Sequence, residues 1–142
     1  MAAIGTALEL IDSGSHVIAM DDLYGGTRRL FSGVRERSAG LEFSYVDMSD
    51  ASRVAEALRD NTRMIWIETP SNPLLKLVDL QAVAAAVEGR DVLVVCDNTF
   101  ATPYLQRSAS PTERQRRPPR ADLATLPVPN PRDHSANCAR AS

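Results

Sequence analysis

The chain has 142 residues, which suits one domain of ordinary size and is short for two. Hydrophobic residues make up 44% and charged residues 24%, with a net charge of −2, a composition typical of globular rather than disordered proteins. No apolar run could span a membrane, no secretory signal opens the sequence and two cysteines make no disulfide framework, so we expect a cytoplasmic protein without a membrane partner.

The first half of the chain alternates between helical and extended patterns. One face of a predicted helix carries Ile4, Leu8 and Ile11, and Gly14 is placed to end that helix. A short apolar run predicts a strand over residues 16–20. A polar stretch with helical spacing follows over residues 27–38, and a second strand is predicted over residues 41–46.

The second half continues this alternation. Asp50 and Asp79 each precede a helical pattern of apolar residues, which is the position of an N-cap residue. Strands are predicted over residues 63–67 and 91–96, and Gly89 ends the helix before the second of them. Helices that alternate with strands apolar on both faces indicate an α/β fold, with a mostly parallel sheet flanked by helices.

Function is expected where the strands end, because ligands of parallel sheets bind beyond the carboxyl ends of the strands. Three of the predicted strands run into polar loops there. The loops are, in chain order, DDLYGGT over residues 21–27, ETPSNP over residues 68–73 and DNTF over residues 97–100. The predicted fold brings all three loops to one edge of the sheet.

The last part of the chain differs from the rest in charge and composition. Residues 1–107 hold ten basic against fifteen acidic side chains, whereas residues 108–142 hold six Arg against three acidic side chains. The latter segment also has six of the nine Pro and none of the seven Gly. Few apolar groups offset the entropy of ordering it, so we expect a disordered Arg- and Pro-rich tail. One hypothesis for an Arg-rich tail is nucleic-acid binding, but this tail carries no aromatic residue for base stacking, so we favour a solvated tail and expect no nucleic-acid partner.

The three loops resemble, in order and spacing, motifs of the enzymes of cysteine and methionine metabolism that depend on pyridoxal 5′-phosphate (PLP). This trans-sulfuration family includes cystathionine γ-lyase and cystathionine γ-synthase. The resemblance covers residues 1–107, and it implies part of the large PLP-binding domain of a fold-type I, aspartate aminotransferase-like enzyme. It further implies PLP as cofactor, a sulfur amino acid as substrate and a homo-oligomer as the intact enzyme.

The resemblance assigns cofactor contacts to four residues. Asp97 would hold the proton on the pyridine nitrogen, and Tyr24 would stack on the ring. Asn72 would hydrogen-bond the phenolic oxygen, and Met1 aligns with the last residue of the family's phosphate-binding turn. Three of these have plainer alternatives: Asp97 caps a turn, Tyr24 plugs the sheet edge, and Asn72 serves loop geometry.

The lysine that forms the Schiff base with PLP in the family has no match in this sequence. There it stands in a Ser-x-Thr-Lys motif, whereas the one lysine here, Lys76, follows the ETPSNP loop. We therefore assign no catalytic residue and expect a truncated fragment without activity of its own. Because the resemblance is lost where the composition changes, our hypothesis is that residues 108–142 are a frame-shifted continuation.

Two functional hypotheses follow. In the first, the chain is a fragment of an enzyme that carries out γ-elimination or γ-replacement on cystathionine or a related sulfur amino acid. In the alternative, it is a non-catalytic fragment that interacts with or regulates an intact relative, docking through open sheet edges.

The remaining candidate residues have structural interpretations. His16 and His134 have no partner at metal-ligand spacing, so no metal is expected. Cys96 and Trp66 each stand in an apolar strand and are predicted core residues. The glycines at positions 25–26 are predicted to serve the backbone of their turn.

Overall fold

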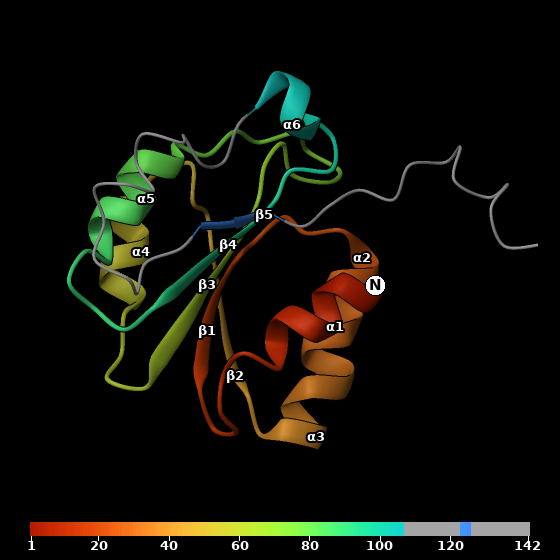
Figure 1. The fold of residues 1–142 in the computed structure, drawn as a ribbon, viewed down its shortest axis with the longest axis vertical. Coiled ribbons are helices and arrows are strands. Elements are labelled where there is room, and N and C mark those ends of the chain that lie inside the picture. The colour runs from red at the N-terminus through yellow and green to blue at the C-terminus, as the bar shows by residue number, and fades with distance from the viewer. Residues whose placement is uncertain (107–122, 126–142) are drawn as a thin grey trace, which may run out of the picture.

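The computed structural model describes residues 1–106 and 123–125. Five parallel strands form one sheet in the order β2-β1-β3-β4-β5 (Figure 1). Their bounds are β1 (His16–Met20), β2 (Glu42–Val46), β3 (Thr62–Glu68), β4 (Leu93–Asp97) and β5 (Leu123–Thr125). This arrangement confirms the predicted α/β fold with a parallel sheet.

Helices cover both faces of the sheet. The segment from α2 to α3 and the N-terminal α1 lie on one face, and α4 and α5 lie on the other (Figure 1). The bounds are α1 (Ala2–Leu8), α2 (Gly25–Leu30), α3 (Glu36–Ala39), α4 (Ser52–Ala57), α5 (Leu80–Ala86) and α6 (Thr102–Leu105). A π-helical turn, Phe31–Arg35, joins α2 to α3 into one run, where the sequence predicts a single helix.

The core lies between the sheet and these helices. Every residue of β1 is buried, as expected of a strand covered on both faces. Phe31 stacks on Phe43 with ring centroids 4.7 Å apart and meets the edge of Trp66 at 5.3 Å. Trp66 and Cys96 are both fully buried, which confirms them as core residues.

Two helix ends differ from the predictions. The first helix stops at Leu8 and not near Gly14, because residues 12–15 form a turn in which the Ser15 N–H donates to the Asp12 carbonyl at 3.2 Å. Gly14 serves this turn, with φ of 79°. The N-cap of α4 is Ala51 and not the predicted Asp50. The Asp50 carboxylate still accepts the Ser52 N–H at 3.0 Å.

The N-terminus of α5 agrees with the sequence prediction. Asp79 is its N-cap, and one carboxylate oxygen accepts the N–H groups of Gln81 and Ala82, each at 3.0 Å. Of the segment predicted to be a disordered tail, only β5 is described, paired in parallel with β4. The other tail residues lie outside the described ranges, where the prediction stays untested. No helix within the described ranges is long and apolar enough to cross a bilayer.

Candidate functional site at the carboxyl edge of the sheet

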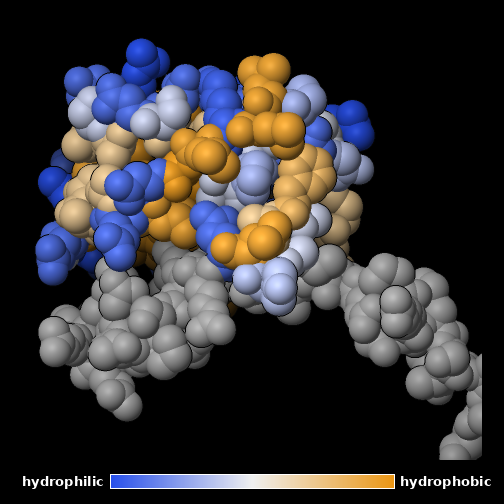
Figure 2. Space-filling model, turned by 90° about the horizontal axis from the view of Figure 1, so that it is seen from above, coloured by the Kyte–Doolittle hydropathy of each residue, from blue (hydrophilic) through white to orange (hydrophobic). Residues whose placement is uncertain are grey.

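Each of the strands β1 to β4 ends in an acidic residue or runs directly into one. Because the strands are parallel, these carboxylates gather at one edge of the sheet. They are Asp21 and Asp22 after β1, Asp47 after β2, Glu68 in β3 and Asp97 in β4. Figure 2 looks onto this edge and shows hydrophobic side chains around a polar centre. Large exposed hydrophobic residues of the loops and of α6 here are Leu74, Leu75, Leu77, Phe100, Tyr104 and Leu105.

Glu68 connects the loops that carry two of the predicted cofactor contacts. Its two carboxylate oxygens accept the backbone N–H of Tyr24 at 3.0 and 3.2 Å, and the backbone N–H of Asn72 also donates to this group. The pairing of β3 with β4 sets Glu68 directly beside Asp97. The side chain is 6% exposed. Glu68 therefore joins two loops at a single buried residue, beside the end of β4.

The protonation of Glu68 differs from that of an ordinary glutamate. Burial raises its pKa to about 7, and the nearby carboxylates of Asp97 and Asp22 add to the rise. The N–H donors from Tyr24 and Asn72 oppose the shift without cancelling it. Near neutral pH this group therefore exchanges between its neutral and charged forms. Glu68 stands in the ETPSNP motif, but no local pattern indicates a role for it.

Asp97 ends β4 with one carboxylate oxygen committed. Oδ1 accepts the backbone N–H of Thr99 at 3.1 Å and its hydroxyl at 2.5 Å, which is the turn-capping contact that the residues alone suggested. The Asp97 carbonyl accepts the Thr69 N–H at 3.1 Å and so joins this turn to the loop after β3. The described hydrogen bonds of the Asp97 side chain all end on Oδ1. Its Oδ2 can therefore take a ligand while the turn stays capped.

Tyr24 stands just before α2 and is 49% exposed, which fits both a ligand contact and the alternative that it plugs the sheet edge. The ring lies over Gly26, where an added Cβ would come within 2.4 Å of the Tyr24 Cε1. Gly26 does not have a positive φ. The structure thus corrects the prediction for this glycine: it makes room for an aromatic ring rather than supplying backbone freedom.

The other two predicted cofactor contacts are placed less tightly. Asn72 is half-buried in the loop between β3 and α5, and its backbone N–H is the part bound to Glu68. Met1 is the N-cap of α1 and 57% exposed, and its carbonyl accepts the Gly5 N–H at 3.0 Å. The structure therefore links Tyr24, Asn72 and Asp97 through Glu68, and no described contact links Met1 to them.

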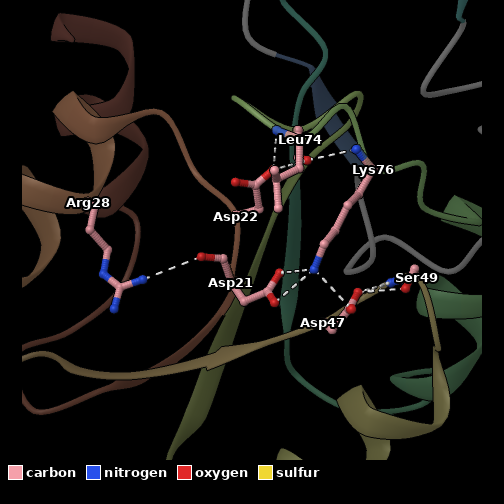
Figure 3. A network of polar contacts seen from close by, with 8 residues as sticks. Asp21, Asp22, Arg28, Asp47, Ser49, Leu74 and Lys76 are labelled. Atoms are coloured by element: carbon pink, nitrogen blue, oxygen red, sulfur yellow. Dashed lines mark hydrogen bonds and ion pairs between the residues drawn. The ribbon is translucent and has the colours of Figure 1, made fainter.

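A second polar group at this edge involves the lone lysine (Figure 3). The ammonium of Lys76 donates to both oxygens of Asp21 at 2.9 and 3.1 Å and to Asp47 at 2.9 Å. Hydrogen bonds to Asp21 and Asp47 raise the pKa of Lys76. The Ser49 hydroxyl and Lys76 together lower the pKa of Asp47 to about 2. The lysine is therefore held as a cation between two carboxylates.

The loop of Lys76 is also bound to Asp22. One oxygen of that carboxylate accepts a short hydrogen bond from the Ser71 hydroxyl and the backbone N–H of Leu74 at 2.9 Å. These contacts join residues about fifty positions apart, so no local pattern in the sequence predicts them. The adjacent acids of the first motif and the lysine without an assigned role were the signs in the sequence that pointed to such a polar group. Within the described ranges, no group of His, Cys, Asp and Glu side chains could hold a metal ion.

Comparison with known proteins points to one family of enzymes. The family model described as "Cys/Met metabolism PLP-dependent enzyme" matches residues 1–110. The chain is 54% identical over 107 residues to a cystathionine beta-lyase of Coxiella burnetii, covering 75% of this chain and 28% of that protein. It is 48% identical over 106 residues to a cystathionine gamma-lyase of Dictyostelium discoideum, covering 75% and 27%.

The comparison with solved structures points to the same family. The crystal structure of cystathionine gamma-lyase from Lactobacillus plantarum complexed with L-serine matches with a TM-score of 0.73 and 42% identity. That match covers 75% of this chain and 28% of the other. The chain thus spans about 28% of the length of the relatives that it matches.

Proposed function

Because the chain belongs to the family of Cys/Met metabolism PLP-dependent enzymes, we propose that the carboxyl edge of its sheet binds PLP. The proposed contacts are Asp97, Tyr24 and Asn72, with Met1 beside the phosphate. The observation that supports this proposal is the place of Glu68, which binds the backbone N–H groups of Tyr24 and Asn72 and lies beside Asp97 in the sheet.

The chemistry of these side chains fits the cofactor. A pyridine ring with a protonated nitrogen needs a carboxylate, which the uncommitted Oδ2 of Asp97 supplies. The ring also needs an apolar face, which the half-exposed ring of Tyr24 offers at a contact worth about 0.5–1.5 kcal/mol. The side-chain amide of Asn72 supplies a donor for the phenolic oxygen.

When bound, PLP withdraws electrons from the substrate carbon that loses a proton, which allows a bond beside that carbon to break. Asp97 keeps a proton on the ring nitrogen and so strengthens this withdrawal. Tyr24 and Asn72 orient the ring. Burial favours the neutral form of the Glu68 carboxyl group, which lies beside Asp97 in the sheet.

The substrate in the whole enzyme is proposed to be a sulfur amino acid such as cystathionine. Two relatives are named for lyase chemistry on cystathionine, and one solved relative is in complex with L-serine, an amino acid. The relatives include a beta-lyase as well as gamma-lyases, so the proposal extends from γ-chemistry to cleavage on either side of the sulfur. We also propose that the whole enzyme is a cytoplasmic homo-oligomer.

The chain alone is proposed to be inactive on such substrates. Its one lysine does not match the family's Schiff-base position, and its ammonium is held by Asp21 and Asp47. Because the ammonium of Lys76 is held by two carboxylates, treatment with PLP and then borohydride should leave no stoichiometric adduct on this lysine. A stoichiometric adduct on Lys76, or turnover of cystathionine, would contradict this.

Cofactor binding can be tested with pyridoxine 5′-phosphate, which lacks the aldehyde and cannot react with Lys76. Binding should quench the fluorescence of Trp66, the only tryptophan, which stands two residues before Glu68. Asp97→Asn should weaken binding about tenfold or more, as expected for a lost charged hydrogen bond. Glu42→Gln, at the opposite end of the sheet, is the control and should bind normally. Failure of the unaltered chain to bind at millimolar ligand would overturn the proposal.

One observation favours the second candidate function, a fragment that docks onto an intact relative. Leu74, Leu75 and Leu77 are 59–70% exposed on the same edge as the proposed cofactor site. Size-exclusion chromatography with and without an intact relative tests this function. Co-elution would support it, and a monomer that ignores the relative would exclude it.

A further inference from the structure

We propose that Lys76 is a positioning residue for Asn72. By bridging Asp21 and Asp47, it holds the loop between β3 and α5, residues 69–79, in the conformation that presents Asn72 to the ligand. This inference rests on the proposed function, because it takes Asn72 as a cofactor contact. Lys76 itself touches no reacting group.

The first argument is the reach of the lysine. Lys76 belongs to the loop after β3, yet its ammonium binds the residue after β1 and the residue after β2. These are the next two strands of the sheet in that direction. A single cation thus ties the loop to two strand ends, and Figure 3 shows it between the two carboxylates. The side chain is 24% exposed, so the pairs are partly shielded from water.

The second argument is that most apolar side chains of the loop do not fix its shape. Its leucines 74, 75 and 77 are 59–70% exposed, and among its large hydrophobic side chains only Val78, at the end next to α5, is buried. Leu75 has a φ of 56°, a left-handed conformation that a leucine adopts only under constraint. Polar contacts must therefore decide the shape of the loop.

The third argument is that these polar contacts form one connected set around Asn72. Ser71, its neighbour, donates its N–H to the Lys76 carbonyl at 3.0 Å, and its hydroxyl oxygen accepts the Lys76 N–H at 2.9 Å. The same hydroxyl donates to Asp22. The turn that carries Asn72 is thus closed on the backbone of Lys76, while the ammonium of Lys76 fixes its far end to the sheet.

A double-mutant cycle tests whether Lys76 acts through Asn72. Lys76→Met keeps the length of the side chain and removes the charge, and it should weaken pyridoxine 5′-phosphate binding about three- to tenfold. In an Asn72→Ala background the same change should have no further effect. A full loss in both backgrounds would overturn the proposal, because it would mean that the lysine acts on the anionic ligand directly.

The matched control is Arg59→Met. Arg59 pairs with Glu42 at 2.9 Å and with Ser44 at 3.1 Å, so this variant also removes one cation with two partners, at the other end of the sheet. It should bind like the unaltered chain. Lys76→Arg should restore part of the lost affinity. If Arg59→Met weakened binding as much as Lys76→Met, the inference would fail.

Hydrogen exchange of the ligand-free chain separates this inference from the proposed function. Lys76→Met should speed exchange at the amides of Leu74 and Lys76, which are bonded to Asp22 and Ser71. If Lys76→Met does not fold, Asp47→Asn removes one of the two bridges and should show the same change. Unchanged exchange would overturn the positioning role, whereas absence of ligand binding by the unaltered chain would overturn only the proposed function.

Discussion

At the scale of single residues, the burial of Glu68 makes stability depend on pH. The residue is 6% exposed, and the pKa of its carboxyl group rises to about 7 from an ordinary 4.5. Because the folded state holds this proton more tightly than the unfolded chain, its contribution is fully present below about pH 4.5. That contribution is lost as the pH rises through about 7. The burial of Glu68 also fixes two loops of the proposed site, so the stability that it costs at higher pH is linked to the proposed function.

Glu68→Gln should remove this pH dependence, because an amide does not titrate. At pH 8 the variant should be more stable than the unaltered chain by up to about 3 kcal/mol, and at pH 4.5 the two should be similar. Urea unfolding followed by Trp66 fluorescence measures this. Glu42→Gln is the control. A stability difference that is the same at both pH values would contradict the assignment.

The glycine pair of the first loop allows a second test at this scale. An alanine at Gly26 would place its Cβ 2.4 Å from the Tyr24 ring, whereas one at Gly25 would meet only the Arg29 guanidinium at 3.4 Å. Gly26→Ala should therefore weaken pyridoxine 5′-phosphate binding about two- to tenfold, because the stacking contact is lost. Tyr24→Ala should weaken it to the same extent. Fluorescence titration of the Gly25→Ala and Gly26→Ala variants is the measurement. Equal affinities for the two would show that the ring is not displaced.

At the scale of secondary structure, the two ends of the sheet are held by different groups. The carboxyl ends of β1 to β4 gather carboxylates, whereas at the amino end His16 of β1 bridges two strands beside the ion pair of Arg59 with Glu42. His16 donates or accepts through Nδ1 to Thr62 of β3 at 2.8 Å and through Nε2 to Ser44 of β2 at 2.9 Å. The imidazole therefore links three adjacent strands where they begin.

This histidine predicts a second pH effect, opposite in sign to that of Glu68. Burial and the nearby Arg59 lower the pKa of His16, so the unfolded chain takes up the proton more readily. Its contribution to stability is present above about pH 6.5 and is lost as the pH falls below that value.

His16→Gln should therefore cost about 1–2 kcal/mol at pH 7.5, for the lost hydrogen bonds, and less at pH 5. Urea unfolding at the two pH values gives the difference between variant and unaltered chain. A difference that grows toward acid pH would contradict the lowered pKa.

At the scale of the whole molecule, the carboxyl edge of the sheet exposes more hydrophobic side chains than a binding site made of polar residues needs. The chain spans about 28% of the length of its relatives, and leucines of residues 69–79 stand exposed beside the proposed cofactor site. A surface of this kind favours association with another chain.

Replacing two of these leucines should reduce that association without unfolding the chain. Leu74→Ser combined with Leu77→Ser removes side chains that are 66% and 70% exposed, so the free energy of unfolding should change by less than about 0.5 kcal/mol. Sedimentation velocity should show a smaller share of associated species. Val34→Ser, 45% exposed on the helical layer, is the matched control. Equal association in both variants would show that the edge is not the contact.

Local patterns were sufficient for much of the fold. The strand over residues 16–20, the cap at Asp79 and the burial of Trp66 depend on a period of two or 3.6 residues, or on contacts within one turn, which a single sequence displays. The early end of α1 and the role of Gly26 were missed. Each depends on where a neighbouring side chain or turn lies in space, and no local spacing records that.

The sequence by itself determined the kind of fold, the sheet edge where function is expected and the resemblance that assigns Asp97, Tyr24 and Asn72. Only the tertiary structure decided how the edge is held together. Glu68 binds a loop forty-four residues before it, and Lys76 reaches a carboxylate fifty-five residues before it. Such pairs meet because parallel pairing brings distant strand ends side by side, and the burial that shifts the pKa of Glu68 exists only once the sheet has formed.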